Sequence, residues 1–269
     1  MMIDRIEIDK RASSIRQEFG VQTYGIKDIF SLVEQKNVHL IRFPFGHDVL
    51  LGFATFYEGN FVIASNSSEI LSREIFTIAH ELGHILYDFE DKISGVKIDQ
   101  NLEENSEDLS EARAFYFANC FLMPEDHLVK FIKYELKKRH DELTALDIVR
   151  MQMEFQVSYA ALVVRLYNLK IIDARQKSAL FDARNDATSR VLFKQMDADE
   201  RLLKPSGVTA VPPSYLEYVI SNYEQGYIPF SSLDKALKKV GMDANVLNKE
   251  DNINFEQPVD LDDIFEEYQ

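Results

Sequence analysis

The chain has 269 residues, of which 46% are hydrophobic, and it carries a formal net charge of −15 at pH 7. This is enough apolar material for one large or two modest domains, and no apolar run is long enough to span a membrane. The acidic balance argues against direct binding to nucleic acid, which requires clustered Lys and Arg, and it would favour attraction to a basic protein.

Cysteine usage and the first residues indicate the compartment. Cys120 is the only cysteine, which excludes an internal disulfide and suits a reducing cytosol. Its setting, FANCFLMP, predicts a small buried side chain rather than a nucleophile. The start, MMIDRIEIDK, mixes acids and bases without an apolar core and does not resemble a signal peptide. We therefore expect a cytoplasmic protein.

The N-terminal part combines helices with a short sheet. Helical patterns cover residues 4–19 and 26–36, and strand patterns cover residues 38–43, 50–57 and 61–65. A short turn separates the last two strands, as in a hairpin. An edge strand of this sheet could hold an extended peptide by strand addition, and the pattern leaves open which strand lies at the edge.

Residues 72–89, SREIFTIAHELGHILYDF, predict an amphipathic helix that contains an HExxH motif. His80 and His84 are four residues apart, so both imidazoles project from one face and can bind one zinc ion. Glu81 is rotated about 100° from His80, which disfavours it as a third ligand and favours it as a general base. The alternative is a surface helix with two incidental histidines, but the apolar surroundings make an unpaired Glu costly.

A catalytic zinc site normally takes three protein ligands, so the third must come from elsewhere in the chain. A second helical pattern follows, in which Glu111 continues the apolar face formed by Ala114, Phe115, Ala118, Phe121 and Leu122. A carboxylate on that face is costly unless it is paired or bound to a metal. Glu111 is therefore the preferred third ligand, and Glu107 and Glu104 are weaker candidates.

These two helices resemble those of the ImmA/IrrE family of zinc metallopeptidases. In that family, a segment similar to FTIAHELGHILY is followed by a helix with the pattern E-x-x-A-N-x-F-A, and this helix ends in L-L-M-P. Residues 76–84 match the first element closely, and residues 111–124 fall in register with the second. By that register, the resemblance implies the zinc ligands His80, His84 and Glu111 and the catalytic residue Glu81. Phe115 departs from the family pattern, which commonly has Asn there.

The later part of the chain offers a rival function. The apolar residues within 144–168 are spaced as in a helix-turn-helix motif, which suggests sequence-specific DNA binding. The second helix, SYAALVVRLYN, carries only Arg165 as a base, whereas a recognition helix needs more donors facing the groove. We therefore favour helices that pack on the core, an arrangement that is also common in the ImmA/IrrE family.

These patterns predict an α+β fold in three parts. Residues 1–173 form a compact zincin-like domain, mostly helical with a short sheet of about three strands. Residues 174–249 form a mainly helical region, with helices near 212–226 and 231–241. The resemblance to the ImmA/IrrE family implies that this region would recruit substrate or regulate activity. Residues 250–269 form an acidic tail without Lys or Arg.

The first functional hypothesis is a cytosolic zinc endopeptidase, in which Zn²⁺ activates a water and Glu81 moves its proton. Tyr159, His127 and Tyr87 are candidates, by residue type alone, for a second donor to the oxyanion. The resemblance implies a protein substrate, typically a helix-turn-helix repressor whose cleavage derepresses genes. The alternative is a non-proteolytic regulatory partner with a structural or vestigial zinc site, which would have no need of Glu81. The sequence does not indicate an oligomeric state.

Overall fold

The computed structural model of the chain describes residues 3–47, 49–57, 59–89, 95–99, 108–186 and 189–244. The chain divides into two compact units, Met1–Val208 and Thr209–Gln269. Across these described ranges, no helix is both long enough and apolar enough to cross a membrane.

The first unit contains a four-stranded sheet in the order β1-β3-β2-β4. Its strands are β1 (Val38–Phe43), β2 (Gly52–Tyr57), β3 (Asn60–Asn66) and β4 (Gly95–Asp99). β1 is parallel to β3, whereas β2 is antiparallel to both of its neighbours. The three predicted strands are present, and Tyr57 pairs with Asn60 across the predicted hairpin.

The fourth strand, β4, adds an edge that the sequence did not reveal. Its five residues, GVKID, include a glycine and two charged side chains, which are poor strand formers. β4 pairs with β2 alone, and β1 lies at the opposite edge. Both edges of the sheet are therefore defined by the backbone pairing.

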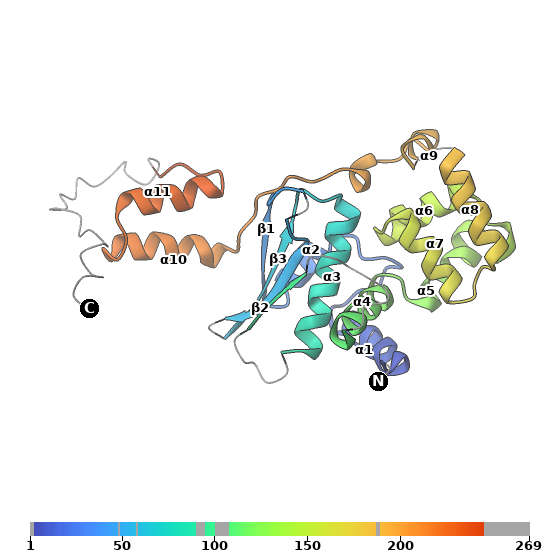
Figure 1. The fold of residues 1–269 in the computed structure, drawn as a ribbon, viewed down its shortest axis with the longest axis horizontal. Helices are drawn as coiled ribbons and strands as arrows, with labels where there is room; N and C mark the ends of the chain where they lie inside the picture. The colour runs from blue at the N-terminus through green and yellow to red at the C-terminus, as the bar shows by residue number, and fades with distance from the viewer. Residues whose placement is uncertain are drawn as a thin grey trace. The chain divides into compact units, whose positions relative to one another are not determined.

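Two helices form successive layers on this sheet, one directly against the strands and the next behind it, as Figure 1 shows. α3 (Leu71–Tyr87) contacts β2 and β3 on one side and α4 (Leu109–Leu122) on the other. α1 (Arg5–Glu18) packs against α4, and α2 (Ile29–Glu34) packs against β1 and α3. The long central helix thus has neighbours on opposite sides, which explains why nearly all of its residues are buried.

A glycine allows α3 and α4 to approach closely. A Cβ atom at Gly83 would lie 3.0 Å from the Cα of Ala114 and 3.2 Å from Cδ1 of Phe117. Such distances are too short for relaxed packing, so any side chain at this position would push the two helices apart. Gly83 is one of the two variable positions of the HExxH motif, and it therefore helps to set where α4 lies against the motif.

The remaining helices of the first unit extend the same core. They are α5 (Glu125–Lys130), a π-helical segment (Phe131–Leu136), a 3₁₀ turn (His140–Glu142), α6 (Ala145–Phe155), α7 (Tyr159–Asn168), α8 (Ala174–Asp186), α9 (Ser189–Gln195) and a second 3₁₀ turn (Glu200–Leu203). The left-handed conformation of Gln156, with φ of 57°, ends α6 and turns the chain into α7.

The first compact unit includes α8 and α9, the helices that follow residue 173. Leu180, Leu192, Phe193 and Leu202 are buried in the same core as the sheet and α3. The backbone of Leu71 also donates to the carbonyl oxygen of Lys204 at 2.9 Å, beside the start of α3. Packing therefore carries the first unit to Val208, because these later helices bury their apolar faces against it.

The second unit is a helical hairpin of α10 (Pro213–Glu224) and α11 (Phe230–Lys239). Both helices agree with the predicted ones. Leu233, Leu237 and Ala244 form its small core. Tyr223 and Phe230 pack against this core, and their rings meet each other edge to face. The acidic tail, residues 250–269, lies outside the described residues. With the helices of the first unit, this hairpin makes the protein a mostly helical α+β protein, as the sequence predicted.

Candidate metal centre

His80 and His84 project from α3 toward α4, one helical turn apart. Both are buried, with 1% and 0% of their surface exposed. Their Nε2 atoms are 3.0 Å apart, and the rings meet edge to face with centroids 4.7 Å apart. Helical spacing alone brings two imidazole nitrogens to one point, as the motif predicted.

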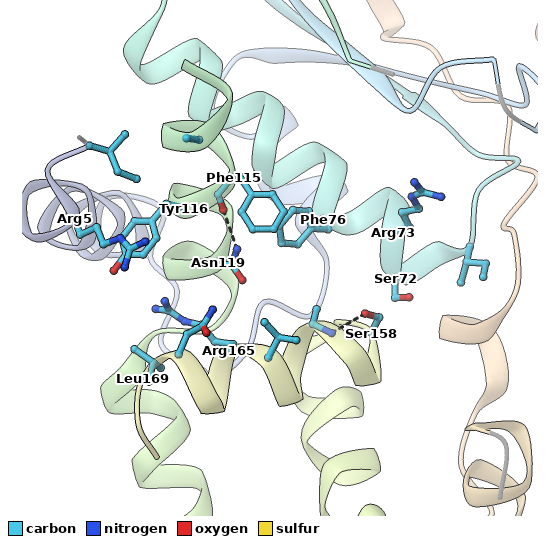
Figure 2. A pocket seen from close by; sticks show the side chains of 16 residues that line it. Arg5, Ser72, Arg73, Phe76, Phe115, Tyr116, Asn119, Ser158, Arg165 and Leu169 are labelled. Atoms are coloured by element: carbon cyan, nitrogen blue, oxygen red, sulfur yellow. Dashed lines mark hydrogen bonds between the residues drawn. The ribbon is translucent and has the colours of Figure 1, made fainter. Parts of the chain in front are cut away.

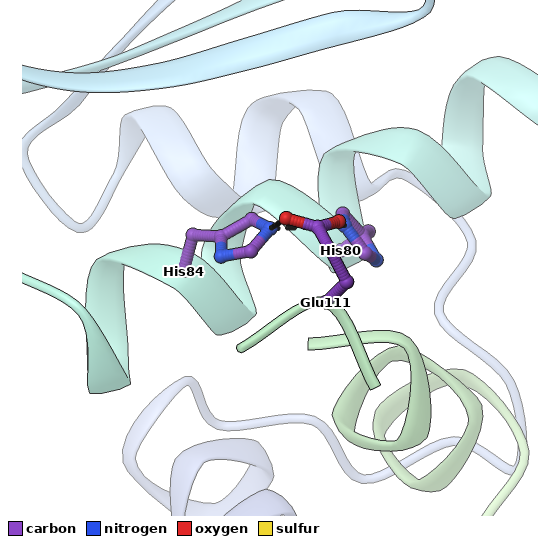
Figure 3. A group of neighbouring side chains, drawn as sticks. All are labelled: His80, His84 and Glu111. Carbon is purple, nitrogen blue, oxygen red and sulfur yellow. Dashed lines mark hydrogen bonds and ion pairs between the residues drawn. The ribbon is translucent and has the colours of Figure 1, made fainter. Parts of the chain in front are cut away.

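Glu111 reaches the same point from the first turn of α4. The helix begins after Asp108, whose side chain accepts from the backbone N–H of Ser110 at 2.8 Å and caps it. The Glu111 carboxylate lies between the two rings, with Oε2 3.2 Å from Nε2 of His80 and Oε1 3.5 Å from Nε2 of His84 (Figure 3). Glu107 and Glu104, the weaker candidates, lie outside the described residues.

The geometry of these three side chains fits a small metal ion. Their donor atoms all lie within 4.8 Å of one another. Tetrahedral zinc bonds of about 2.0–2.1 Å separate neighbouring donor atoms by about 3.3 Å. The observed separations of 3.0, 3.2 and 3.5 Å bracket that value. Two imidazoles and one carboxylate are also a donor set that catalytic zinc takes in proteins.

Glu81 lies on an adjacent face of α3, turned toward the sheet. Its side chain is completely buried, and a Cβ atom at Gly52 of β2 would come within 3.3 Å of its Oε1 atom. The same Cβ would lie 2.6 Å from Cγ2 of Thr77. Only a glycine at residue 52 leaves room for the carboxylate between α3 and β2, a requirement that the sequence did not reveal.

Asp88, the residue that caps the C-terminal end of α3, supports His84 from four residues further along the chain. Its Oδ2 atom lies 2.5 Å from Nδ1 of His84 and accepts from the hydroxyl of Ser110 at 2.5 Å. Its Oδ1 atom accepts from the guanidinium of Arg113, also at 2.5 Å. A carboxylate on Nδ1–H directs the Nε2 lone pair of a histidine toward a metal. Asp88 was not predicted from the sequence, although its spacing of four residues from His84 was a usable signal.

The start of α3 is fixed by a buried ion pair. Glu74 is 1% exposed, and its two carboxylate oxygens accept from the guanidinium of Arg42 on β1 at 2.8 and 2.9 Å. The hydroxyls of Ser65 and Ser206 each donate to the same carboxylate at 3.0 Å. These contacts join α3 to two strands and to the segment that follows α9, so they fix the helix that carries both histidines.

The three candidate oxyanion donors have other contacts. The hydroxyl of Tyr159 donates to the carbonyl oxygen of Leu180 at 2.8 Å, and burial raises the pKa of Tyr159 to about 12. Nδ1 of His127 lies 2.9 Å from the carbonyl oxygen of Tyr24. Burial also raises the pKa of Tyr87 above its ordinary value, and the Arg113 guanidinium lies 4.9 Å from its ring centroid. Tyr87 is thus the candidate that shares a neighbour with Asp88.

An HExxH helix with a carboxylate from the next helix is the arrangement of a metallopeptidase centre. Comparison with known families agrees: the model of the peptidase family described as the IrrE N-terminal-like domain matches residues 21–167. The chain belongs to this family, which confirms the resemblance seen in its sequence, and family membership supports a metallopeptidase. No curated protein matches the chain. The matched range contains α3 and α4, and therefore every residue of the cluster.

Proposed function

We propose that the protein is a zinc-dependent endopeptidase. The observation that carries this proposal is the convergence of His80, His84 and Glu111 on one point, with the buried Glu81 on the neighbouring face of the same helix. Zinc bound there would supply a Lewis acid that polarises the scissile carbonyl group and acidifies water. The donor set and the family together support this metal.

Each residue has a distinct part in the proposed reaction. Glu81 accepts a proton from the attacking water and returns it to the leaving amine, which is the role of a general base and then a general acid. Asp88 holds the Nδ1–H of His84, so that Nε2 of that ring faces Glu111. The side chain of Glu81 is completely buried, on the side of α3 that faces β2.

The proposed substrate is a specific regulatory protein in the cytoplasm, of the helix-turn-helix repressor class that the family resemblance implies. The formal charge of −15 favours encounter with a basic, DNA-binding protein. The buried, unpaired Cys120 suits a reducing compartment. Cleavage of the repressor would then derepress its genes.

Two other functions are less well supported. A purely structural zinc site gives no reason to bury a carboxylate beside the histidines, because that burial costs free energy. Direct DNA reading by α7 would need exposed donors, whereas Arg165 is only 4% exposed and donates to the carbonyl oxygen of Met123 at 3.3 Å. Neither function accounts for the placement of Glu81.

The test is the substitution Glu81→Gln in protein co-expressed with candidate repressors. We expect full zinc content, measured by atomic emission, together with loss of repressor cleavage, measured by mass spectrometry of the fragments. Glu34→Gln, at an exposed position on α2, is the matched control and should cleave as the wild type does. Cleavage that survives in Glu81→Gln would refute the proposed role of Glu81.

A further inference from the structure

A cavity of about 510 Å³ lies next to the metal centre, bounded by α3, α4, α7 and the start of the chain (Figure 2). Its volume falls within the range of about 300–1,000 Å³ that is usual for small-molecule sites. Phe76, one turn before His80, and Phe115, one turn after Glu111, both line it, with ring centroids 5.2 Å apart. The cavity is therefore adjacent to the cluster, although none of the three cluster residues lines it.

The charge of the cavity is opposite to that of the protein. Arg5, Arg73 and Arg165 line it, and among the described residues no Asp or Glu does, in a chain whose net charge is −15. Arg73 is already paired with Glu69 at 3.2 Å. Arg5 and Arg165 face the same ring from different elements, because their guanidinium carbons lie 5.2 and 5.7 Å from the ring centroid of Tyr116. One end of the cavity thus concentrates two positive charges.

Neither of these two charges forms an ion pair with a described residue. Within the part of the chain that the structure describes, no carboxylate oxygen lies within 4.0 Å of the guanidinium of Arg5 or Arg165. Arg165 is 4% exposed and is held in place by the carbonyl oxygen of Met123 and by Sγ of Cys120, at 3.3 and 3.5 Å. A buried, fixed cation of this kind is costly unless an anion accompanies it.

Apart from the three arginines, the cavity combines apolar side chains with the uncharged polar side chains of Ser72, Asn119, Ser158 and Asn168. Figure 2 shows Phe76 and Phe115 between the Arg5 end and the Arg73 end of the cavity, and Ala161 and Val164 of α7 also line it. The side-chain amide of Asn119 donates to the carbonyl oxygen of Phe115 at 3.0 Å, which fixes this polar side chain against α4. An apolar body with a single charged end would match this distribution.

We propose that this cavity binds a small organic anion with an apolar or aromatic body. Its anionic group would lie at the end formed by Arg5, Arg165 and Tyr116, and its body would pack against Phe76, Phe115 and Val164. Charge-assisted hydrogen bonds from guanidinium groups recognise a carboxylate or sulfonate, and the aromatic side chains recognise the body. This site is separate from the proposed peptidase chemistry and does not depend on it.

The test uses two fluorescent probes with similar aromatic bodies, anilinonaphthalene sulfonate and the uncharged phenylnaphthylamine, titrated into the full-length protein. We expect Arg5→Gln to weaken binding of the sulfonate by about tenfold, the effect of losing one charge-assisted contact. Binding of the uncharged probe should change by less than about twofold. The matched control is Arg11→Gln, on the same helix and outside the cavity, which should bind both probes as the wild type does.

A second variant tests the location independently. Ala161→Trp places a large side chain in the cavity from α7 and should remove binding of both probes, while circular dichroism shows an unchanged fold. Unchanged sulfonate affinity in Arg5→Gln, or an equal loss of both probes in that variant, would overturn the proposed anion site. Wild-type binding in a folded Ala161→Trp variant would overturn it as well.

Discussion

The substitution Asp88→Asn tests how the metal centre is held together. The change keeps the size of the side chain but removes the negative charge that contacts His84, Ser110 and Arg113, each at 2.5 Å. An amide oxygen can still accept from Nδ1–H of His84, so the ring is not released. The loss is the charge that makes the imidazole a stronger ligand and that neutralises Arg113.

The expected magnitude follows from the supporting role of Asp88. Loss of a carboxylate that orients a metal-binding histidine costs about 10–100-fold in metal affinity, which corresponds to about 1.4–2.8 kcal/mol. We expect the lower half of this range for Asp88→Asn, because the amide retains one contact, and the upper half for Asp88→Ala. The ordering of the two variants is therefore part of the prediction.

Zinc affinity should be measured by competition with a chromophoric chelator at a fixed pH, and the melting temperature of the metal-free protein should be measured in parallel. Asp126→Asn is the matched control, because this carboxylate forms an exposed ion pair with Lys130 on α5, away from α3 and α4. Wild-type zinc affinity in both Asp88 variants would refute the idea that Asp88 positions His84. An affinity loss in Asp126→Asn of the same size would refute its specificity.

Three further predictions concern packing and burial. Gly83→Ala should destabilise the protein by about 1–3 kcal/mol in urea unfolding, because the new Cβ meets Ala114 at 3.0 Å, and unchanged stability would contradict the close helix contact. Arg42→Gln should cost about 3–5 kcal/mol, since it leaves the carboxylate of Glu74 buried without its guanidinium, whereas Arg73→Gln, in the exposed pair with Glu69, should cost about 0–1 kcal/mol. Cys120 is 2% exposed and burial raises the pKa of its thiol to about 11, so a thiol reagent at neutral pH should label it only as fast as the protein unfolds, and rapid labelling of the native protein would contradict this.

Local spacing was sufficient to predict the residues of the cluster. His80 and His84 are related by one helical turn, and Glu111 was identifiable because a carboxylate interrupts an otherwise apolar helix face. Asp88 obeys the same rule of spacing, at four residues from His84. The relative positions of side chains on one helix depend only on their spacing along the chain, so they can be predicted from the sequence.

Contacts between distant segments could not be predicted in the same way. Arg42 and Ser206 meet at Glu74 from positions 32 and 132 residues away, and nothing in the local sequence of Glu74 indicates either partner. The same holds for Gly52, whose importance depends on the register in which β2 faces Thr77 and Glu81. The end of the first unit at Val208 also depends on where Phe193 and Leu202 find apolar neighbours.

The two glycines explain how one helix can place the two histidines on one side and Glu81 on the other. α3 is compressed between β2 and α4, with Gly52 on one side and Gly83 on the other allowing close approach. On the α4 side, the approach brings Glu111 to within 3.5 Å of both imidazoles; on the sheet side, it encloses the carboxylate of Glu81. A larger residue at either position would move one functional group away from the others, because the helix cannot shift toward one neighbour without leaving the other. The arrangement of His80, His84, Glu111 and Glu81 therefore depends on the lack of a side chain at Gly52 and Gly83 as well as on the four side chains themselves.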